Sequence, residues 1–477
     1  MPTYIPTIGL EIHAQISTKT KLFCSCDNDS FDKEPNINTC PVCMGFPGTL
    51  PVLNQDALKK AIMASLALNC KINNFSRFDR KNYFYPDLPS GFQISQYEQP
   101  LAEKGNLIVN VENVEKNIGI TRLHMENDAG KLTHVPGGTL CDYNRSGTPL
   151  MEIVSEPDIT TPKEAVSYAR EIQKIIRAVD SSDADMEKGM MRFDINVSLK
   201  KPEDKQLGVK VEVKNLNSFR SLEKALEYEI SRQTESLKKG ESIIQETRGF
   251  DAEKEITVSQ RVKEQAHDYR YFPEPDLPPM EIAKNEIEEM KKALPELPSA
   301  KKDRYQKEYD LQEHYIETLL EDIDLGKFFE ELVALTNLPQ RSITWTNDII
   351  LNQLKKEKIS IKEAKIKAPE LAYLIKAIEN NEISNLKAKE EIFPEMWETG
   401  ETPEIIIEKK GLKQVNDLSS LEQICSQIIA ENQKAVADLK NGNERSLGFL
   451  VGQGMAKSKG QANPKILSEI IRKKINQ

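Results

Sequence analysis

Long apolar runs are missing from this sequence, and so is a recognisable leader. No segment approaches the roughly 20 apolar residues that a membrane-spanning helix needs, so we expect no membrane partner. Residues 1–8 carry neither the basic region nor the apolar core of an export signal, which predicts a cytoplasmic protein. In that reducing compartment the seven cysteines are expected to be thiols or metal ligands rather than disulfides.

Several catalytic signatures are missing as well. The phosphate-binding pattern GxxxxGK[ST] is absent, and the DAGK segment at residues 128–131 does not replace it. There is no Gly/Ser-rich amidase segment with a serine nucleophile, and no cysteine has an obvious histidine partner. Phosphate binding would therefore depend on a metal and scattered cations. The net charge of −10 argues against a protein that coats nucleic acid over its whole surface.

What the first half of the chain does contain is a series of short strands with one apolar and one charged face. Side chains alternate across a strand, so the charged residues of each segment share a side. The segments 8–16, 121–126, 191–199 and 209–214 together form what we call the polar floor, with the residues Glu11, His13, Glu126, Arg192, Asp194 and Lys214. Ordinary solvated sheets also alternate. The mixture of acids, a histidine and arginines favours instead an active-site floor for a metal and phosphates.

Helices and turns complete the pattern of this half. Thr161, Pro162 and Glu164 form an N-terminal capping signal for one helix, and Ser218 begins a second that runs to about residue 239. Their apolar stripes predict packing on the apolar face of the sheet, which indicates an α+β fold. Residues 79–101 are rich in proline and aromatic residues and are expected to be loop, either filling a core or presenting Lys81 to a ligand. A turn at residues 142–148 precedes a strand that carries Glu152.

Four of the cysteines form two close pairs. Cys24 and Cys26 are followed, after thirteen intervening residues, by Cys40 and Cys43. This spacing is typical of a structural zinc site with four thiolate ligands, which leaves no open position for chemistry. Unrelated thiols and a redox-active second pair are the alternatives.

Cations and composition divide the rest of the chain. Arg248 and Arg270 are candidate anion contacts because the guanidinium fork matches phosphate oxygens. The composition becomes rich in Lys, Glu, Ile and Leu near residue 293, and a second break falls at 400–403. We therefore expect three parts, covering residues 1–293, 294–404 and 405–477. The last part ends in a basic segment that predicts contact with an RNA backbone, or alternatively a solvated helix face, with the residues Lys457, Lys459, Lys465 and Arg472.

Eight segments of the chain resemble a known family. They are GLEIHAQ, RKNYFYPDLPSGFQISQ, DAGKLTH, DYNRSGTPLMEIVSEPDI, EVKNLNSF, QETRGFD, DYRYFPEPDLPP and GFLVGQGMAKSKGQANP. These resemble the B subunits of the tRNA-dependent amidotransferases GatCAB, from the first strand to the tail. The resemblance implies a glutamine-synthetase-like cradle domain with an antiparallel sheet and helices on one face. An all-α helical domain and a small YqeY-like tail domain would follow it.

The resemblance also implies a reaction. ATP would phosphorylate the side-chain carboxylate of misacylated Glu-tRNA(Gln) or Asp-tRNA(Asn), and ammonia would then displace the phosphate. Such an enzyme is a carbon–nitrogen ligase that uses glutamine as its amide donor. In the family the ammonia comes from glutamine hydrolysed by an amidase A subunit and travels through a channel, while a small C subunit completes a heterotrimer.

The family's functional positions carry over onto residues of this sequence. Mg²⁺ would bind Glu11, His13, Glu126 and Glu152, and ATP contacts are expected from Arg192, Asp194, Lys214, Arg248 and Arg270. Lys81 matches a lysine near the channel mouth and the site of phosphorylation. Asn127 stands where many members have a second acid, which is associated with gating the ammonia channel, so Asp128 becomes the candidate for that role and for a place among the catalytic residues. Ser90 stands where lysine is common.

Two other functions fit parts of the sequence. A stand-alone amide ligase would use a free amino acid and free ammonia, but it would not need the basic helical tail. A non-catalytic RNA-binding assembly factor would not need the acids of the polar floor. Turnover of ATP that depends on tRNA distinguishes the three possibilities.

Overall fold

The computed structural model describes residues 4–262, 269–412, 418–458 and 462–475. Its contacts divide the chain into two compact units, Met1–Lys301 and Lys302–Gln477, which are described separately. The three-part division at residues 293 and 404 stays a prediction.

The first unit is built on a nine-stranded sheet with the order β14-β13-β12-β11-β1-β10-β7-β6-β2. Neighbouring strands are antiparallel except β12 and β13, which are parallel. In that order the strands are β14 (Ile256–Val262), β13 (Glu246–Asp251), β12 (Val211–Leu216), β11 (Met191–Lys200), β1 (Ile5–Gln15), β10 (Pro149–Ser155), β7 (Val114–Asn127), β6 (Ala102–Val111) and β2 (Lys71–Ile72). The expected antiparallel sheet is thus a mixed one. The predicted segment 209–214 also begins too early, because Val209 lies before β12 and is 47% exposed.

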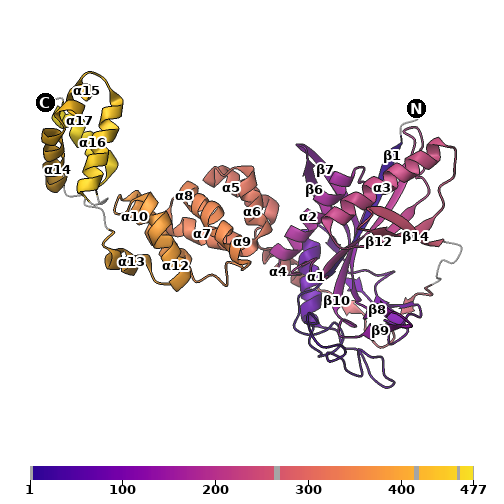
Figure 1. The fold of residues 1–477 in the computed structure, drawn as a ribbon. Coiled ribbons are helices and arrows are strands. Elements are labelled where there is room, and N and C mark those ends of the chain that lie inside the picture. The colour runs from indigo at the N-terminus through magenta and orange to yellow at the C-terminus, as the bar shows by residue number, and fades with distance from the viewer. Residues whose placement is uncertain (1–3, 263–268, 413–417, 459–461, 476–477) are drawn as a thin grey trace. The chain divides into compact units, whose positions relative to one another are not determined.

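Helices cover one face of this sheet. They are α1 (Gln55–Ala67), α2 (Pro162–Ala178) and α3 (Phe219–Lys238), and α2 and α3 lie side by side (Figure 1). The predicted caps are confirmed, since Thr161 accepts a hydrogen bond from the Glu164 amide and Ser218 from the Ser221 amide. The Glu164 carboxylate, however, accepts from the amide of Thr160 rather than from that of the cap residue.

The apolar residues of the alternating strands lie beneath these helices. Leu10 and Ile12 of β1 and Phe193 of β11 are completely buried in one hydrophobic cluster with residues of α2. The charged residues of the same strands therefore project from the opposite face, the polar floor.

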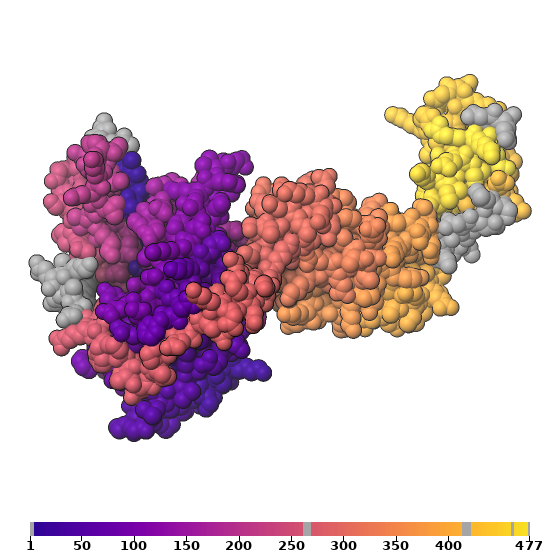
Figure 2. All heavy atoms as spheres, turned by 180° about the vertical axis from the view of Figure 1, so that it is seen from behind, coloured from indigo at the N-terminus to yellow at the C-terminus, as the bar shows by residue number. Residues whose placement is uncertain are grey.

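Three small sheets accompany the large one. They are β15 (Phe272–Pro273) with β4 (Asp79–Asn82) and β5 (Phe92–Ser95), β16 (Met280–Glu281) with β3 (Phe75–Ser76), and β8 (Lys131–Val135) with β9 (Gly138–Asp142). In Figure 2 the salmon-coloured chain near residues 270–300 crosses the indigo first hundred residues, which it meets through β15, β16 and α4 (Lys284–Lys292). The prediction that residues 79–101 are loop is wrong at 79–82 and 92–95, where β4 and β5 pair with each other, and β15 joins β4 from almost two hundred residues later. The residues between and after these two strands are loop, as predicted.

The second unit is helical, as the sequence predicts. Its elements are α5 (Pro298–Tyr309), which spans the division between the units, α6 (Glu313–Glu321), α7 (Ile323–Thr336), α8 (Pro339–Ile343), the π-helix η2 (Thr344–Ile350), α9 (Leu351–Glu357), α10 (Ala368–Glu379), α11 (Asn385–Lys387), the π-helix η3 (Ala388–Ile392), α12 (Phe393–Thr399), α13 (Pro403–Lys410), α14 (Leu418–Glu431), α15 (Gln433–Lys440), α16 (Glu444–Lys457) and α17 (Pro464–Ile475). One hydrophobic cluster ends at Leu412 and a separate one begins at Leu421. Among the described residues, no helix is long and apolar enough to cross a membrane.

Candidate functional site

The strand register brings the polar floor residues into rows across the sheet. His13 of β1 lies opposite Glu152 of β10 on one side and Arg192 of β11 on the other. His124 of β7 lies opposite Glu152 in turn. Directly opposed residues of antiparallel strands share a face, so these four side chains form one row on the polar floor.

Three of the expected metal ligands converge in this row. One donor atom each from His13, Glu126 and Glu152 lies within 4.8 Å of the others, and all three residues are buried. The His13 Nε2 atom is 3.3 Å from Glu152 Oε2 and 4.0 Å from Glu126 Oε1. The Ser95 hydroxyl of β5 donates to Glu126 Oε2 over 3.2 Å and steadies that carboxylate.

His124 is a member of this group that the sequence analysis did not select as a site residue. Its Nε2 atom lies 3.4 Å from Glu152 Oε2 and 3.9 Å from Glu126 Oε2, and its side chain is only 3% exposed. Glu152 Oε2 therefore lies between two imidazoles. The available signal was the alternation that places His124 two residues before Glu126 on the same face.

The electrostatics of the row are those of a cation site. Burial acts to lower the pKa of His13, but the Glu152 carboxylate raises it above its usual value. Burial acts to raise the pKa of Glu152, but the two imidazoles hold it well below its usual range. The Nδ1 atoms of His13 and His124 are buried without a hydrogen-bond partner in the described chain. Two carboxylates and imidazole nitrogens in a buried cluster fit a divalent cation.

Glu11, the fourth expected metal ligand, lies on the same strand as His13 but outside the 4.8 Å group. Its carboxylate accepts a hydrogen bond of 2.8 Å from the Asn196 side chain. Burial, together with the charges of Glu152 and Asp194, raises the pKa of Glu11 above its usual value. Its role as a ligand stays a prediction.

Lys81 of β4 faces this group. Its Nζ atom lies 5.1 Å from the centre of the Tyr269 ring and 6.0 Å from that of Tyr83. Burial acts to lower the pKa of Lys81, but the carboxylates of Glu126 and Glu152 raise it. The strand that the sequence analysis took for a loop thus brings a cation to the predicted metal site.

Asp128 is held by two arginines at the end of the polar floor. Its carboxylate lies 3.5 Å from both the Arg192 Nη1 and the Arg145 Nε atoms and accepts from the Ala129 amide. Burial acts to raise the pKa of Asp128, yet the charges of Arg192 and Arg145 keep it below its usual value. Asn127 is held too, since its side-chain oxygen accepts from the Ile94 amide over 2.7 Å.

Asp194 and Lys214 form an ion pair further along the sheet. The Lys214 Nζ atom is 3.6 Å from Asp194 Oδ2 and 3.1 Å from Glu212 Oε1. Burial acts to lower the pKa of Lys214, but the carboxylates of Asp194 and Glu212 raise it. The structure therefore brings two of the expected ATP contacts together.

Arg248, a further expected ATP contact, is not brought to the polar floor, and the side chain of Arg270 lies at the surface. Arg248 lies beside Val213 in the parallel β12–β13 pair and so points to the helix-covered face, where it contacts Glu229 of α3 at 3.0 Å. The Arg270 side chain is exposed, while its backbone oxygen accepts from the Asn82 side chain over 2.8 Å.

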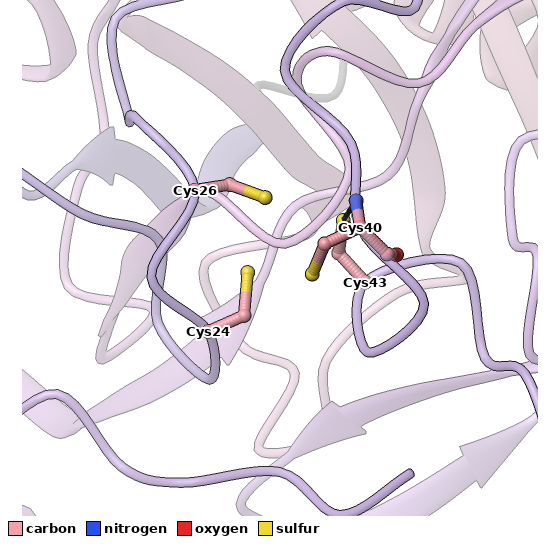
Figure 3. A group of neighbouring side chains, drawn as sticks. All are labelled: Cys24, Cys26, Cys40 and Cys43. Carbon is pink, nitrogen blue, oxygen red and sulfur yellow. Dashed lines mark hydrogen bonds between the residues drawn. The ribbon is translucent and has the colours of Figure 1, made fainter.

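The four cysteines of the predicted zinc site come together. Cys24 and Cys26 lie on one loop and Cys40 and Cys43 on another, with their side chains turned toward the space between (Figure 3). One Sγ atom from each lies within 4.8 Å of the others, which fits a tetrahedral thiolate site. The pKa of the Cys43 thiol is lowered to about 5, chiefly by a hydrogen bond from Cys24 and also by one from the Cys40 amide. Burial acts in the opposite direction.

A buried lysine connects this cysteine cluster to the polar floor. Lys21 is completely buried, and its Nζ atom lies 2.6 Å from the Asn38 oxygen, 3.4 Å from the Tyr143 oxygen and 3.8 Å from Cys43 Sγ. The turn that begins at Tyr143 carries Arg145, the partner of Asp128.

A cavity of about 240 Å³ lies between the cysteine cluster and the end of the polar floor. Cys43, Ser90, Asn127 and Gly147 are among its lining residues. Asn127, the last residue of β7, thus shares this cavity with the cysteine loops, while Glu126 is not among the residues that line it.

The basic residues of the tail are partly paired with acids. Lys457 lies 2.6 Å from Glu431, and Arg472 lies 2.5 Å from Glu444. Lys465 is exposed at the start of α17, and Lys459 lies outside the described residues. The three described residues are exposed, and the role of the set in RNA binding stays a prediction.

Comparison with known proteins identifies the family to which the whole chain is similar. A family model described as "GatB/GatE catalytic domain" matches residues 6–288, and one described as "GatB domain" matches residues 327–475. The chain is 49% identical to the B subunit of an aspartyl/glutamyl-tRNA(Asn/Gln) amidotransferase from Persephonella marina, over 98% of each chain. The protein of the same name from Thermotoga maritima is 47% identical over 98% of each chain. For the one from Carboxydothermus hydrogenoformans the identity is 46%, over 100% of this chain and 99% of the relative. The chain described here therefore belongs to the GatB family.

Proposed function

We propose that this chain is the component of a tRNA-dependent amidotransferase that activates and amidates the misacylated amino acid. Its substrates are Glu-tRNA(Gln), Asp-tRNA(Asn) or both, and ATP supplies the phosphate. The buried group of His13, Glu126 and Glu152 on the polar floor carries this proposal, together with full-length similarity to relatives named for that reaction. The activity would take place in the cytoplasm.

The first step is a phosphoryl transfer. A side-chain carboxylate oxygen of the substrate attacks the terminal phosphorus of ATP, the new P–O bond forms, and the bond to the β-phosphate oxygen breaks with release of ADP. A bound Mg²⁺ would neutralise charge on the phosphates. Glu126, Glu152 and His13 would hold that ion, with His124 beside them and Glu11 as the remaining predicted ligand. An imidazole-containing donor set also suits Mn²⁺.

The second step is displacement of the phosphate by ammonia. Nitrogen attacks the acyl carbon, inorganic phosphate leaves with the C–O bonding pair, and the nitrogen loses one proton to give the amide. Lys81 interacts electrostatically with Glu126 and Glu152 and would stabilise negative charge that develops on the acyl phosphate. Arg192 holds Asp128 beside this site, and the Lys214–Asp194 pair is positioned for the nucleotide.

Ammonia and RNA would come from partners and from the tail. An amidase A subunit would produce ammonia and a small C subunit would complete the heterotrimer. The cavity lined by Asn127 and Ser90 supports an entry for ammonia next to Glu126. The tail cations Lys457, Lys465 and Arg472 would contact the tRNA backbone, and the two hydrophobic clusters of the second unit support a separate YqeY-like tail after a helical domain. A glutamine-synthetase-like cradle is our interpretation of the first unit.

The cysteine cluster would hold a structural Zn²⁺ through four thiolates. All ligands come from the protein, so the ion would fix the loops around Lys21 and take no part in the reaction.

Product formation tests the proposal. The chain is co-expressed with candidate A and C subunits from the same source, and Glu-tRNA(Gln) and Asp-tRNA(Asn) are supplied separately with ATP and glutamine. We expect ADP release and an amidated aminoacyl-tRNA with at least one of them. Turnover with free glutamate and ammonia but without tRNA would establish a small-molecule ligase instead. Tight RNA binding with no ATP turnover would establish an assembly factor.

A further inference from the structure

Arg122 lies on the polar floor but has no partner there. It belongs to β7, two residues before His124 and four before Glu126, and therefore projects from the same face. Its cross-strand neighbour on β10 is Val154, which offers no hydrogen-bond acceptor in its side chain. Glu11 lies beyond Val154 in the same row of the sheet.

The guanidinium of Arg122 lacks an ion-pair partner among the described residues, whereas Arg192 and Lys214 each have one. The Nε atom of Arg122 is buried and has no hydrogen-bond partner in the described chain. Glu103 lies directly opposite on β6, yet these two described residues form no ion pair. By contrast, Arg192 is paired with Asp128, and Lys214 with Asp194 and Glu212.

The charge of Arg122 acts on Tyr271, as do the carboxylates of Glu126 and Glu152. Burial and the carboxylates of Glu126 and Glu152 raise the pKa of Tyr271, and the charge of Arg122 opposes this rise. Tyr271 therefore borders both the acids and the arginine. Its ring is stacked on that of Tyr97, with 4.3 Å between the two ring centres.

An unpaired, half-buried guanidinium next to a candidate metal group calls for an anionic ligand. Its planar fork donates two parallel hydrogen bonds, which match the oxygens of a phosphate. A phosphate chain bound by a cation at Glu126 and Glu152 carries further oxygens that need a second positive group. Arg122 precedes His124 by two residues and is therefore the next side chain along the same face of β7. Two residues of a strand span about 7 Å, a distance that a chain of linked phosphates can bridge.

We propose that Arg122 binds a phosphate group of the nucleotide whose other phosphates are held by the metal at His13, Glu126 and Glu152. This assignment rests on the proposed function and adds a contact that the sequence analysis did not select. Arg122 acts through direct contact with the nucleotide, and it is not required for binding of tRNA.

Nucleotide binding to the complete heterotrimer tests this contact. ATP, ADP and adenosine are titrated calorimetrically with Mg²⁺ present, using wild type, Arg122→Gln, Arg122→Lys and the control Arg220→Gln. Arg220 is 80% exposed and pairs with Glu255, away from the floor. We expect Arg122→Gln to weaken ATP binding at least tenfold while adenosine changes less than twofold. Arg122→Lys, which keeps the charge without the fork, should fall in between, and Arg220→Gln should match wild type.

Four outcomes would overturn the proposal. ATP binding within twofold of wild type in Arg122→Gln would remove Arg122 from the phosphate site. Equal losses for ATP and adenosine would indicate disturbed folding or base recognition. A rise confined to the KM for Glu-tRNA(Gln) would make the ligand the substrate carboxylate. Failure of the wild-type complex to bind ATP at all would overturn the proposed function as well, which distinguishes the two claims.

Discussion

Glu229 is a completely buried acid between α3 and the strands β13 and β14. It accepts hydrogen bonds from Arg232, Thr257 and Gln233 and forms an ion pair with Arg248 at 3.0 Å. A buried carboxylate is tolerated only when such partners compensate for lost hydration. The network therefore attaches the last two strands of the sheet to the helix layer.

Removing the charge of Glu229 should destabilise the first unit. We expect Glu229→Gln to lower the free energy of unfolding by about 1.5–3 kcal/mol, because bonds to charged groups are lost while Arg248 stays buried. Glu227→Gln is the matched control on the same helix, since its exposed pair with Lys224 should be worth less than about 1 kcal/mol. Urea unfolding monitored by hydrogen exchange of α3 amides measures both. Equal stabilities of the two variants would contradict the role of the network.

The same residue predicts a dependence on pH. Burial acts to raise the pKa of Glu229, but Arg232 and Thr257 hold it below the ordinary value of 4.5. Because the folded-state pKa is the lower one, this stabilisation is fully present above pH 4.5 and is lost as the pH falls through the folded value. The stability difference between wild type and Glu229→Gln should therefore be constant from pH 7 to about 5 and shrink below that. A difference that grew on acidification would contradict this sign.

For single residues, the sequence predicted which face of a strand a side chain occupies better than it predicted which residues that side chain contacts. Alternation correctly placed Glu11, His13 and Glu126 on one face before any register was known. It could not show that Arg248 points to the helix layer, because that follows from the parallel pairing of β12 and β13. The alternation also places His124 and Arg122 on this face. The sequence does not show that His124 contacts Glu152 or that the buried Nε atom of Arg122 has no hydrogen-bond partner in the described chain.

The two cysteine loops are hydrogen-bonded to a neighbouring turn, so a metal bound by the cysteines is expected to stabilise that turn as well. The Leu22 amide donates to the Gly147 oxygen over 2.9 Å, and Lys21 contacts the Tyr143 oxygen. The cysteine cluster is thereby joined to the turn that carries Arg145, and through it to Asp128.

We predict one Zn²⁺ per chain and a local response to its removal. Chelation should increase hydrogen exchange in residues 20–49 and 143–148, because the thiolates would no longer hold the loops together. Exchange of α2 amides should change little, since the helix packs in the hydrophobic core. Cys40→Ser should lower the zinc content, whereas Cys141→Ser, outside the cluster, should retain it. A zinc-free native protein, or a uniform response across the sheet, would argue against this account.

Elements made from local signals were predicted well, and those made from distant pairing were not. The cap signals of α2 and α3 lie within four residues of each helix start, so the sequence displays them directly. The short strands β4 and β5 were missed although they pair with each other, and the pairing of β4 with β15 and the bond from Arg80 to Glu274 join residues almost two hundred positions apart. Proline and aromatic content alone does not reveal such a sheet.

For the whole molecule, the account separates chemistry in the first unit from RNA binding in the tail. Deleting residues 418–477 leaves the hydrophobic cluster that ends at Leu412 intact. We expect this truncation to weaken tRNA binding at least tenfold, because several phosphate contacts are lost. ATP binding should stay within twofold of wild type. Filter binding of tRNA and calorimetry with ATP measure the two effects, and a parallel loss of both would contradict the separation.

The shift in composition marks the division between the two compact units only approximately. The shift to Lys, Glu, Ile and Leu near residue 293 precedes the division of contacts at Lys301 and Lys302. The family resemblance covered the entire chain, which no single physical pattern did.

A decisive experiment measures ATP hydrolysis by the heterotrimer with and without misacylated tRNA, in wild type and in Glu126→Gln. The variant keeps the shape of the side chain but removes one negative charge from the metal group. The account predicts hydrolysis stimulated by misacylated tRNA in wild type and in the surface control Glu98→Gln. It predicts at least a hundredfold loss in Glu126→Gln, with tRNA affinity unchanged within twofold. Wild-type hydrolysis that ignores tRNA, or full activity in Glu126→Gln, would contradict it.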